Sequence, residues 1–315
     1  MRYASAMSFE KILVAIAALS TSCYSPPQAP AGGLSPERRI VAIGDVHGDW
    51  DATLRALRLA GAIDESQHWS GGDLIVVQTG DQLDRGDGER DILLLFEQLA
   101  IDAQEAGGEF HSLLGNHEIM NAALDFRYVT PGGFADFESV PTSNLDALTR
   151  ESLSPHERAR AAAFQPGGPF AVSLASHDVI LVLGDSVFVH GGVLPAHVEY
   201  GIDKINEETR QWLLGKSEKP NVMVGPDSPI WDRTYSNEPT EEAPETLRVT
   251  LELLGVKRMV IGHTVQEGGI RALCDGDAWC IDVGMASHYG GPIEVLEIVG
   301  DRVTVLREAE VLTPL

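Results

Sequence analysis

Five short polar segments of this chain carry residue types suited to chemistry on a charged substrate. Each contains Asp, His, Asn or Arg beside glycine, and each follows a short apolar run that predicts a β-strand. Ligands in open α/β sheets bind at the carboxyl ends of the strands, so we expect these segments to meet. They are Gly44-Asp45-Val46-His47-Gly48, Gly80-Asp81-Gln82-Leu83-Asp84-Arg85-Gly86, Gly115-Asn116-His117-Glu118, His190-Gly191-Gly192 and Gly262-His263-Thr264.

The first and third segments combine hard oxygen donors with imidazole nitrogens. Asp45 and His47 lie two residues apart, which lets a carboxylate and an imidazole reach one metal ion. Asn116 offers a neutral carbonyl oxygen, and the adjacent His117 can be a ligand, a base or an acid. A plainer interpretation is also open, because Asn116 can cap a helix whose first turn favours Glu118.

The other three segments add charge and two further histidines. Asp81, Asp84 and Arg85 lie on one glycine-bounded turn, where they would make a poor core. Their plainer interpretation is a solvated turn with a local ion pair. His190 and His263 each follow an apolar strand beside glycine. A single histidine in that position is usually structural, but two in the same setting favour a common site.

In this order the motifs GDxHG, GDxxDRG, GNHE, HGG and GH resemble the calcineurin-like metallophosphoesterase superfamily. The resemblance covers about residues 39–297, and GDxxDRG with GNHE favours the phosphoprotein phosphatase branch. Residues 80–87, 116–121 with 125–128, and 229–233 are similar to Shewanella-like protein phosphatases. The resemblance implies hydrolysis of phosphomonoesters, with a phosphoprotein or phosphopeptide as substrate. It leaves open whether that substrate carries phosphoserine, phosphothreonine or phosphotyrosine.

The same resemblance implies two divalent metal ions that share one carboxylate and a water of lowered pKa. A donor set of nitrogen and oxygen without thiolate suits Mn, which we expect, and also Fe, Zn or Co. Arg85, Arg233 and Asn116 would bind the phosphoryl oxygens. His117 would protonate the leaving oxygen, and Asp84 would orient His117. The implied metal ligands are Asp45 and His47 for one ion, Asn116, His190 and His263 for the other, and Asp81 as the bridge.

The elements that must position these residues follow an α/β order. Strands and amphipathic helices alternate in the first part of the chain, which is typical of βαβ units. The second part is richer in short strands. Strands are predicted at residues 39–43, 73–79, 109–114, 179–183, 186–190 and 258–261, helices at 49–60, 89–106, 203–214 and 242–254, and short strands with turns in 269–307.

We expect one α/β domain over residues 38–315, a metallophosphoesterase sandwich of two mixed β-sheets flanked by helices. Residues 124–170 interrupt the alternation and are bounded by Gly and Pro. We interpret them as a helical insertion that covers one rim of the sheet and shapes the substrate groove.

The charge of the chain limits its partners. There are 23 Lys and Arg against 47 Asp and Glu, a net charge of −24, so the surface repels phosphate backbones and no nucleic-acid partner is expected. A phosphorylated substrate therefore needs a local positive centre, such as a metal ion or a buried Arg. The chain is 43% hydrophobic and 22% charged, which excludes wholesale disorder.

The N-terminal residues predict export from a bacterial cell. Arg2 and Lys11 precede the apolar run 12–19 and a group of small residues, so we interpret 1–22 as a signal segment and 23–37 as a linker. A core helix is the alternative interpretation. The product would be periplasmic by simple secretion, or anchored to the cell envelope by a lipid on Cys23.

Cys274 and Cys280 flank an Asp-Gly turn that predicts a hairpin. In an oxidising compartment we expect them to form a disulfide, and otherwise they are two half-buried thiols.

Two other functions remain open. A dinucleoside tetraphosphate hydrolase would share the five motifs but normally needs no export. A non-catalytic exported metal-binding protein would not need Asp84, Arg85, His117 or Arg233, so their presence argues against it.

Overall fold

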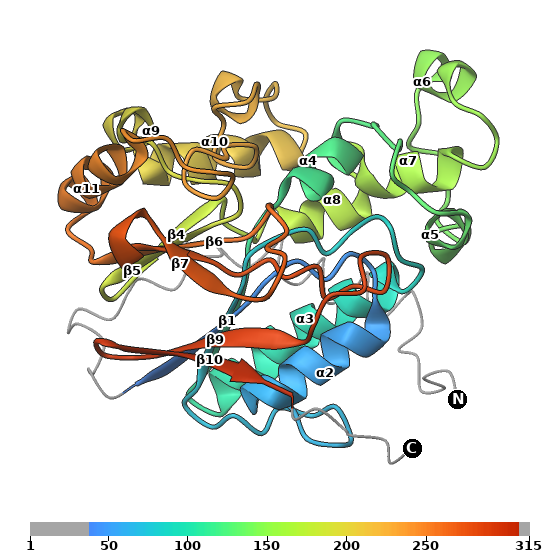
Figure 1. Ribbon diagram of the computed structural model, residues 1–315. Helices are drawn as coiled ribbons and strands as arrows, with labels where there is room; N and C mark the ends of the chain where they lie inside the picture. The colour runs from blue at the N-terminus through green and yellow to red at the C-terminus, as the bar shows by residue number, and fades with distance from the viewer. Residues whose placement is uncertain (1–37, 309–315) are drawn as a thin grey trace.

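The computed structural model describes residues 38–308, which form two five-stranded β-sheets with helices on their outer faces (Figure 1). The first sheet has the order β10-β9-β1-β2-β3. Strands β1, β2 and β3 run parallel to one another, with β3 at one edge of the sheet. Strands β9 and β10 form a hairpin, and β9 pairs antiparallel with β1. The strands are β1 (Arg39–Ile43), β2 (Ile75–Gln78), β3 (Glu109–Ser112), β9 (Glu294–Val299) and β10 (Arg302–Arg307).

The second sheet has the order β4-β5-β6-β8-β7. Strands β5, β6 and β8 are parallel, while β4 and β7 pair antiparallel at the two edges. The predicted sandwich of two mixed sheets is therefore confirmed. The strands are β4 (Ile180–Leu183), β5 (Ser186–Val189), β6 (Arg258–Ile261), β7 (Arg271–Leu273) and β8 (Ala278–Cys280).

Helices α2 (Trp50–Ala60) and α3 (Glu89–Glu105) cover the outer face of the first sheet (Figure 1). The near-helical spacing of Leu54 and Leu57 gives α2 one apolar face, which is buried. Asp49 caps this helix by accepting from the backbone nitrogen of Ala52, and Gly61 ends it at φ 72°, a conformation that suits glycine. The buried faces of α2 and α3 and of the first sheet form one hydrophobic core. This core extends to Phe188 and Val260 of the second sheet, so it joins the two sheets.

The outer face of the second sheet packs against a longer series of helices, and together they enclose a second hydrophobic core. A triangle of aromatic rings lies within it, because Phe137 is 4.9 Å from both Phe164 and Phe170, measured between ring centroids. The helices that follow α3 are α4 (Asn116–Ala122), α5 (Pro131–Asp136), α6 (Ala147–Ser152), α7 (Arg158–Phe164), α8 (Pro169–Leu174), α9 (Pro195–Tyr200), α10 (Ile202–Leu213) and α11 (Ala243–Leu254). Of these, α6 buries none of its residues and contributes none to this core.

Residues 124–170 contain α5, α6 and α7, which agrees with the helical character predicted for them. Their side chains are part of the second core, which also contains Leu83 and Val189. The segment is thus packed against the loop and strand that carry site residues. Its description as an insertion, like the domain limits at residues 38 and 315, stays a prediction.

The predicted disulfide between Cys274 and Cys280 is wrong for this structure, in which both are free thiols. The hairpin is present, but Leu273 pairs with Ala278, and Cys280 faces Arg271 across the ladder. Cys274 lies in the connecting 3₁₀ turn instead of in the strand. The connection is longer than the two-residue turn that Asp-Gly suggested, so the thiols are out of register.

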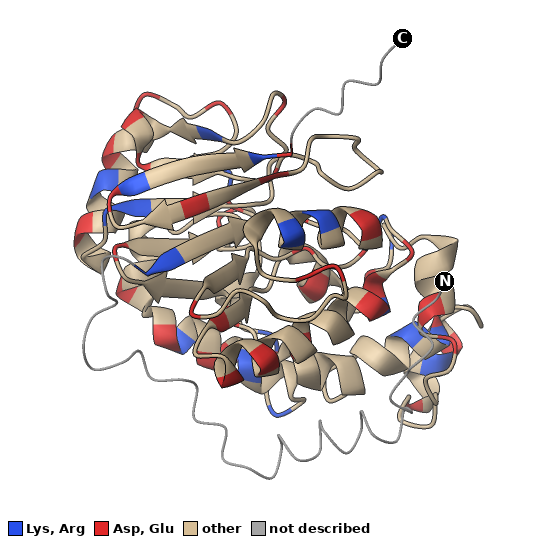
Figure 2. Ribbon diagram, turned by 90° about the horizontal axis from the view of Figure 1, so that it is seen from below, with Lys and Arg blue, Asp and Glu red and all other residues tan. Residues whose placement is uncertain are grey.

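The signal segment 1–22, the linker 23–37 and the candidate lipid anchor Cys23 lie outside the described residues. Across residues 38–308, every helix is too short or too polar to cross a bilayer. Figure 2 shows acidic residues on helices and loops throughout the described part of the chain, with basic residues scattered among them.

Candidate active site

The loops after β1, β2, β3, β5 and β6 meet at the carboxyl ends of these strands and bring all five polar segments together. Asp45 accepts from the backbone nitrogen of His263, and the two carboxylate oxygens are each 3.2 Å from it. His190 lies 2.9 Å from Asn116, measured from Nε2 to Oδ1. Because these residues come from both sheets, the site joins the two halves of the sandwich.

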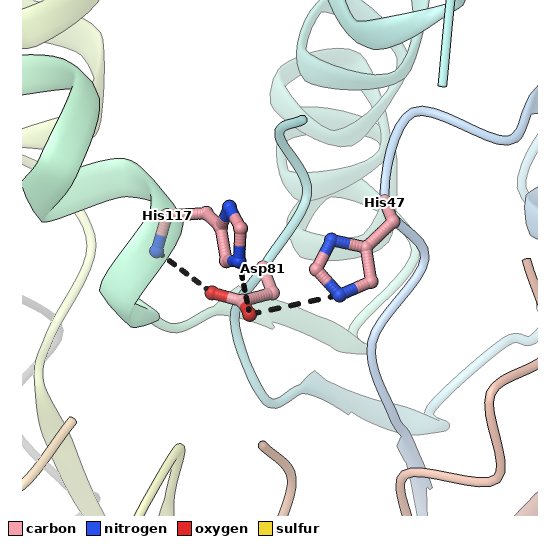
Figure 3. Close-up of side chains that lie close together, drawn as sticks. All are labelled: His47, Asp81 and His117. Carbon is pink, nitrogen blue, oxygen red and sulfur yellow. Dashed lines mark hydrogen bonds and ion pairs between the residues drawn. The ribbon is translucent and has the colours of Figure 1, made fainter. Parts of the chain in front are cut away.

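The buried carboxylate of Asp81 lies at the centre of the site. Its Oδ2 atom is 3.3 Å from Nε2 of His190 and 3.7 Å from Nε2 of both His47 and His117. Figure 3 shows His47 and His117 on opposite sides of this carboxylate. Asp81 therefore belongs to two groups of possible metal ligands, one with His47 and His117 and the other with His190 and His263.

Backbone carbonyls fix how two of these histidines present their nitrogens. His47 Nδ1 donates to the carbonyl of Leu83, and His190 Nδ1 donates to that of Thr79, each over 3.0 Å. A neutral imidazole that donates through Nδ1 carries its lone pair on Nε2, and in both histidines Nε2 is directed toward Asp81. Metal-binding histidines are usually oriented by a hydrogen bond of this kind.

Burial keeps the imidazoles of His47 and His263 neutral, as metal ligands must be. Burial lowers the pKa of His47 to about 3 and that of His263 to about 2. Nε2 of His263 is buried and has no hydrogen-bond partner among the described residues. An unpaired buried nitrogen is costly unless something binds it, so this atom fits a metal ligand.

Buried carboxylates also favour a cation here. Burial, with the charges of Asp282 and Asp81, raises the pKa of Asp45 well above its usual range. Burial raises the pKa of Asp282 to about 6. Such a cluster of acids is stabilised when positive charge is placed among them. The nitrogen and oxygen donors present therefore fit divalent metal ions.

Glu118 holds the second and third segments together. Its two carboxylate oxygens accept from the backbone nitrogens of Gly115, Asp81 and Gln82, over 2.7 to 2.9 Å. Helix α4 begins at Asn116. Its N-cap is Gly115, so the expectation that Asn116 caps this helix is wrong, whereas Glu118 does lie in the first turn. Asn116 also lies within hydrogen-bond reach of His190.

His117 and Asp84 form a hydrogen-bonded pair. His117 Nδ1 lies 2.5 Å from Asp84 Oδ2, and the backbone nitrogen of His117 donates to Asp81 over 2.9 Å. Nε2 of His117 is left facing the site. Its distance to Asp81 equals that of His47, so the geometry brings His117 into the ligand cluster as well as beside Asp84.

Arg85 lies at the mouth of the site between two tyrosines. Its guanidinium carbon is 5.1 Å from the ring centroids of both Tyr128 and Tyr289, and Nη1 is 3.0 Å from Nε2 of His47. Both tyrosines are partly exposed, so the three side chains border the entrance. The stacked rings restrict the guanidinium to one orientation.

Arg233 reaches the same region from the loop after η1 (Asn221–Met223). Its Nη1 donates to Thr264 Oγ1 over 2.9 Å, and burial lowers its pKa while Asp45 and Asp282 raise it. Asp232 instead accepts from the backbone and hydroxyl of Thr234. Among these described residues Arg233 therefore bonds Thr264, and Asp232 bonds Thr234, instead of the two neighbours pairing with each other.

A cavity of about 610 Å³ adjoins Arg233. It is formed by the loop of residues 225–234 and would leave room for groups beside a bound phosphate. Its lining residues are Gly225, Pro226, Asp227, Trp231, Asp232, Arg233 and Thr234.

Sequence reasoning missed several residues of this region. Asp282 follows the apolar strand β8, which is the same signal that identified the five segments. Tyr128 was noted only as part of a motif, and Tyr289 carried no signal of its own. Arg160, which is buried and bonded to Asp84, gave none because its partners are far away in the sequence.

Sequence comparison relates this site to known proteins. Residues 38–267 match the calcineurin-like phosphoesterase family. The chain is 41% identical over 302 residues to Shewanella-like protein phosphatase 2 of Arabidopsis thaliana, with 84% of this chain and 76% of the relative covered. It is 26% identical over 266 residues to Shewanella-like protein phosphatase 1 of Plasmodium berghei, with 81% and 69% covered.

Structural comparison agrees with the sequence. The crystal structure of a cold-active protein-tyrosine phosphatase from a psychrophilic Shewanella species matches with a TM-score of 0.68 and 26% identity, covering 86% of this chain and 80% of the other. A protein serine/threonine phosphatase of Saccharomyces cerevisiae matches in fold alone, with a TM-score of 0.58 and 17% identity over 89% of this chain and 82% of the other. The chain therefore belongs to the calcineurin-like phosphoesterases, hydrolases that act on phosphoric esters, and is related to the Shewanella-like protein phosphatases.

Proposed function

We propose that this protein is a phosphoprotein phosphatase that hydrolyses phosphomonoesters with the help of two divalent metal ions. The observation that carries the proposal is the position of Asp81, whose carboxylate belongs to two separate groups of possible metal ligands. Two cations close together repel each other, and a shared carboxylate offsets that repulsion. Asp45, with His47, would hold one ion.

The second ion would be held by Asn116, His190 and His263. Manganese is the ion we expect, with iron, zinc or cobalt as alternatives that suit the same donors. When bound, such a pair of ions lowers the pKa of a shared water and polarises the phosphoryl group. The orphaned Nε2 of His263 and the fixed Nε2 of His190 support this assignment.

The remaining residues of the site would act on the phosphate and the leaving group. Arg85 and Arg233 would bind phosphoryl oxygens, which supplies local positive charge in a chain whose net charge is −24. His117 would donate a proton from Nε2 to the departing oxygen. Asp84 would hold the imidazole through Nδ1, so that Nε2 stays directed at the substrate.

A phosphoprotein substrate is supported by the related proteins, which are named protein phosphatases. An entrance bordered by Arg85 and two tyrosines, with a cavity beside Arg233, would admit a side chain that projects from a peptide. The test is turnover on a panel of phosphopeptides after reconstitution with manganese. Faster turnover of a dinucleoside tetraphosphate than of every phosphopeptide would contradict the proposal.

His117→Asn distinguishes an acid from a metal ligand at this position. We expect metal content near that of the parent and a fall in kcat of roughly a hundredfold to ten-thousandfold on phenyl phosphate, the range for a lost general acid. Para-nitrophenyl phosphate needs little protonation of its leaving group, so the fall in kcat on this substrate should be much smaller. Loss of one metal ion, or equal losses on both substrates, would remove His117 from the acid role.

We also propose export to the periplasm or to the cell envelope, on the basis of the signal-like residues 1–22. Fractionation of cells that produce the full chain tests this proposal. Cys23→Ser should release the protein from membranes if Cys23 is lipidated, and should change nothing if the chain is simply secreted.

A further inference from the structure

Arg160, in helix α7, is fully buried, and each of its five N–H groups has an acceptor. Nε donates to Asn121 Oδ1 over 2.7 Å. Nη1 donates to Glu89 and to the carbonyl of Gly133, and Nη2 donates to Asp84 Oδ1 over 3.2 Å and to Glu89 Oε1 over 3.0 Å. A guanidinium with all its donors used is held in one orientation.

Two aromatic side chains also pack against the guanidinium. The guanidinium carbon lies 5.1 Å from the ring centroid of Phe137 and 5.2 Å from that of Phe164. Both rings belong to the aromatic triangle of the second core. The position of Arg160 is therefore set by the packing of residues 124–170.

The partners of Arg160 lead directly to the proposed proton donor. Asp84 Oδ1 accepts from Arg160 and from Asn121 Nδ2, which is 3.0 Å away, while Oδ2 is left for His117. The amide of Asn121 also donates to the carbonyl of His117 over 2.9 Å. One hydrogen-bond network thus fixes both the carboxylate of Asp84 and the backbone of His117.

Glu89 extends the network to the backbone of the GDxxDRG turn. It accepts from the backbone nitrogen of Asp84 while it pairs with Arg160. Asp84 and Arg85 both have positive φ, at 67° and 68°, a conformation that side-chain-bearing residues rarely adopt. Such a turn persists only where its surroundings hold it.

We propose that Arg160 is a positioning residue, which fixes the Asp84 carboxylate and thereby the direction of His117 Nε2. The proposal rests on the proposed function, because it concerns the proton donor of that reaction. The alternative is a purely structural ion pair that neutralises Glu89. A structural pair would need only charge, whereas positioning needs the full fork of the guanidinium.

The test compares Arg160→Met and Arg160→Lys with Arg258→Met. Arg258 is also a buried arginine, but it bonds Ser186 in the second sheet. Its removal therefore costs stability without changing the contacts of the Asp84–His117 pair. We expect Arg160→Met to lower kcat on phenyl phosphate by roughly tenfold to a hundredfold, less than loss of the acid itself. Turnover of para-nitrophenyl phosphate and metal content should stay near those of the parent, as should both activities of Arg258→Met.

Arg160→Lys keeps the charge beside Glu89 but cannot reach all the partners of the guanidinium. It should therefore fold like the parent and still show the selective loss on phenyl phosphate. This variant carries the test if Arg160→Met does not fold. Equal losses on both substrates, or full recovery by lysine, would overturn the positioning role.

A spectroscopic measurement separates failure of this inference from failure of the proposed function. The imidazole N–H of His117 bonded to Asp84 can be identified by ¹⁵N-histidine NMR from its disappearance in His117→Asn. We expect its resonance to shift or broaden in Arg160→Met and Arg160→Lys and to persist in Arg258→Met. An unchanged resonance would refute positioning by Arg160, whatever reaction the protein catalyses.

Discussion

Gly262→Ala should weaken metal binding without adding or removing any ligand. Gly262 lies between β6 and His263, and a β-carbon there would meet Oδ1 of Asp45 at 2.5 Å and Oγ1 of Thr79 at 2.8 Å. Ordinary van der Waals contact begins near 3.4 Å. Subtracting the 2.5 Å to Asp45 Oδ1 from that value leaves about 0.9 Å, by which the carboxylate or the strand must move. Metal ligands tolerate a displacement of only about 0.2 Å.

The expected magnitude follows from that displacement. Disturbing the support of a ligand costs roughly 10 to 100-fold in metal affinity, and here a proposed ligand itself is displaced. Calorimetric titration of the metal-free variant with manganese should therefore show a dissociation constant at least about tenfold above that of the parent. Activity should recover in part at high manganese concentration, because the donors are still present.

Gly255→Ala is the matched control for stability. Gly255 ends α11 at φ 69° with open space around its β-carbon position, so alanine there costs roughly 1–2 kcal/mol of backbone strain far from the ligands. It should lower the melting temperature and leave manganese affinity unchanged. If Gly262→Ala bound manganese as tightly as the parent, Asp45 would not be a ligand held in place by this glycine.

Three further predictions concern the bridge, the phosphate clamp and the thiols. Asp81→Asn should release at least one metal ion and abolish turnover, which elemental analysis and a phosphatase assay check together. Arg233→Lys should raise KM and weaken inhibition by inorganic phosphate while both metal ions stay bound, because a point charge cannot grip two oxygens. Iodoacetamide at pH 8 should label Cys280 far more slowly than Cys274 in the native protein, since burial raises the pKa of the Cys280 thiol to about 12.

The sequence predicted well those features that depend on local pattern. Apolar runs that end in glycine and a polar residue marked the ligand loops, because a parallel strand buried on both faces must be apolar until it reaches the sheet edge. Asp45, Asp81 and His263 were found by this rule. The sandwich of two mixed sheets followed from the family resemblance, and pattern alone would not have provided it.

Features that depend on distant partners were not predictable in this way. Arg160 lies in an alanine-rich stretch, and a charged residue there is most simply interpreted as exposed. The carboxylates of Glu89 and Asp84, about 70 residues away, provide the negative charge that its burial requires. The prediction of a disulfide between Cys274 and Cys280 was wrong for the opposite reason. A local turn rule was applied to a longer connection, whose register depends on the pairing of β8 with β6.

The place of β1 in its sheet has a consequence for biosynthesis. This strand, the first of the described chain, lies between β2 and β9, and Arg39 pairs with Val299. One edge of β1 therefore stays without its native neighbour until β9, at residues 294–299, has left the ribosome. Open strand edges invite pairing with other chains, so nascent molecules stalled before residue 294 should be the aggregation-prone species. A chaperone or a translocation channel that holds the chain extended would protect that edge until the β9–β10 hairpin arrives to cover it.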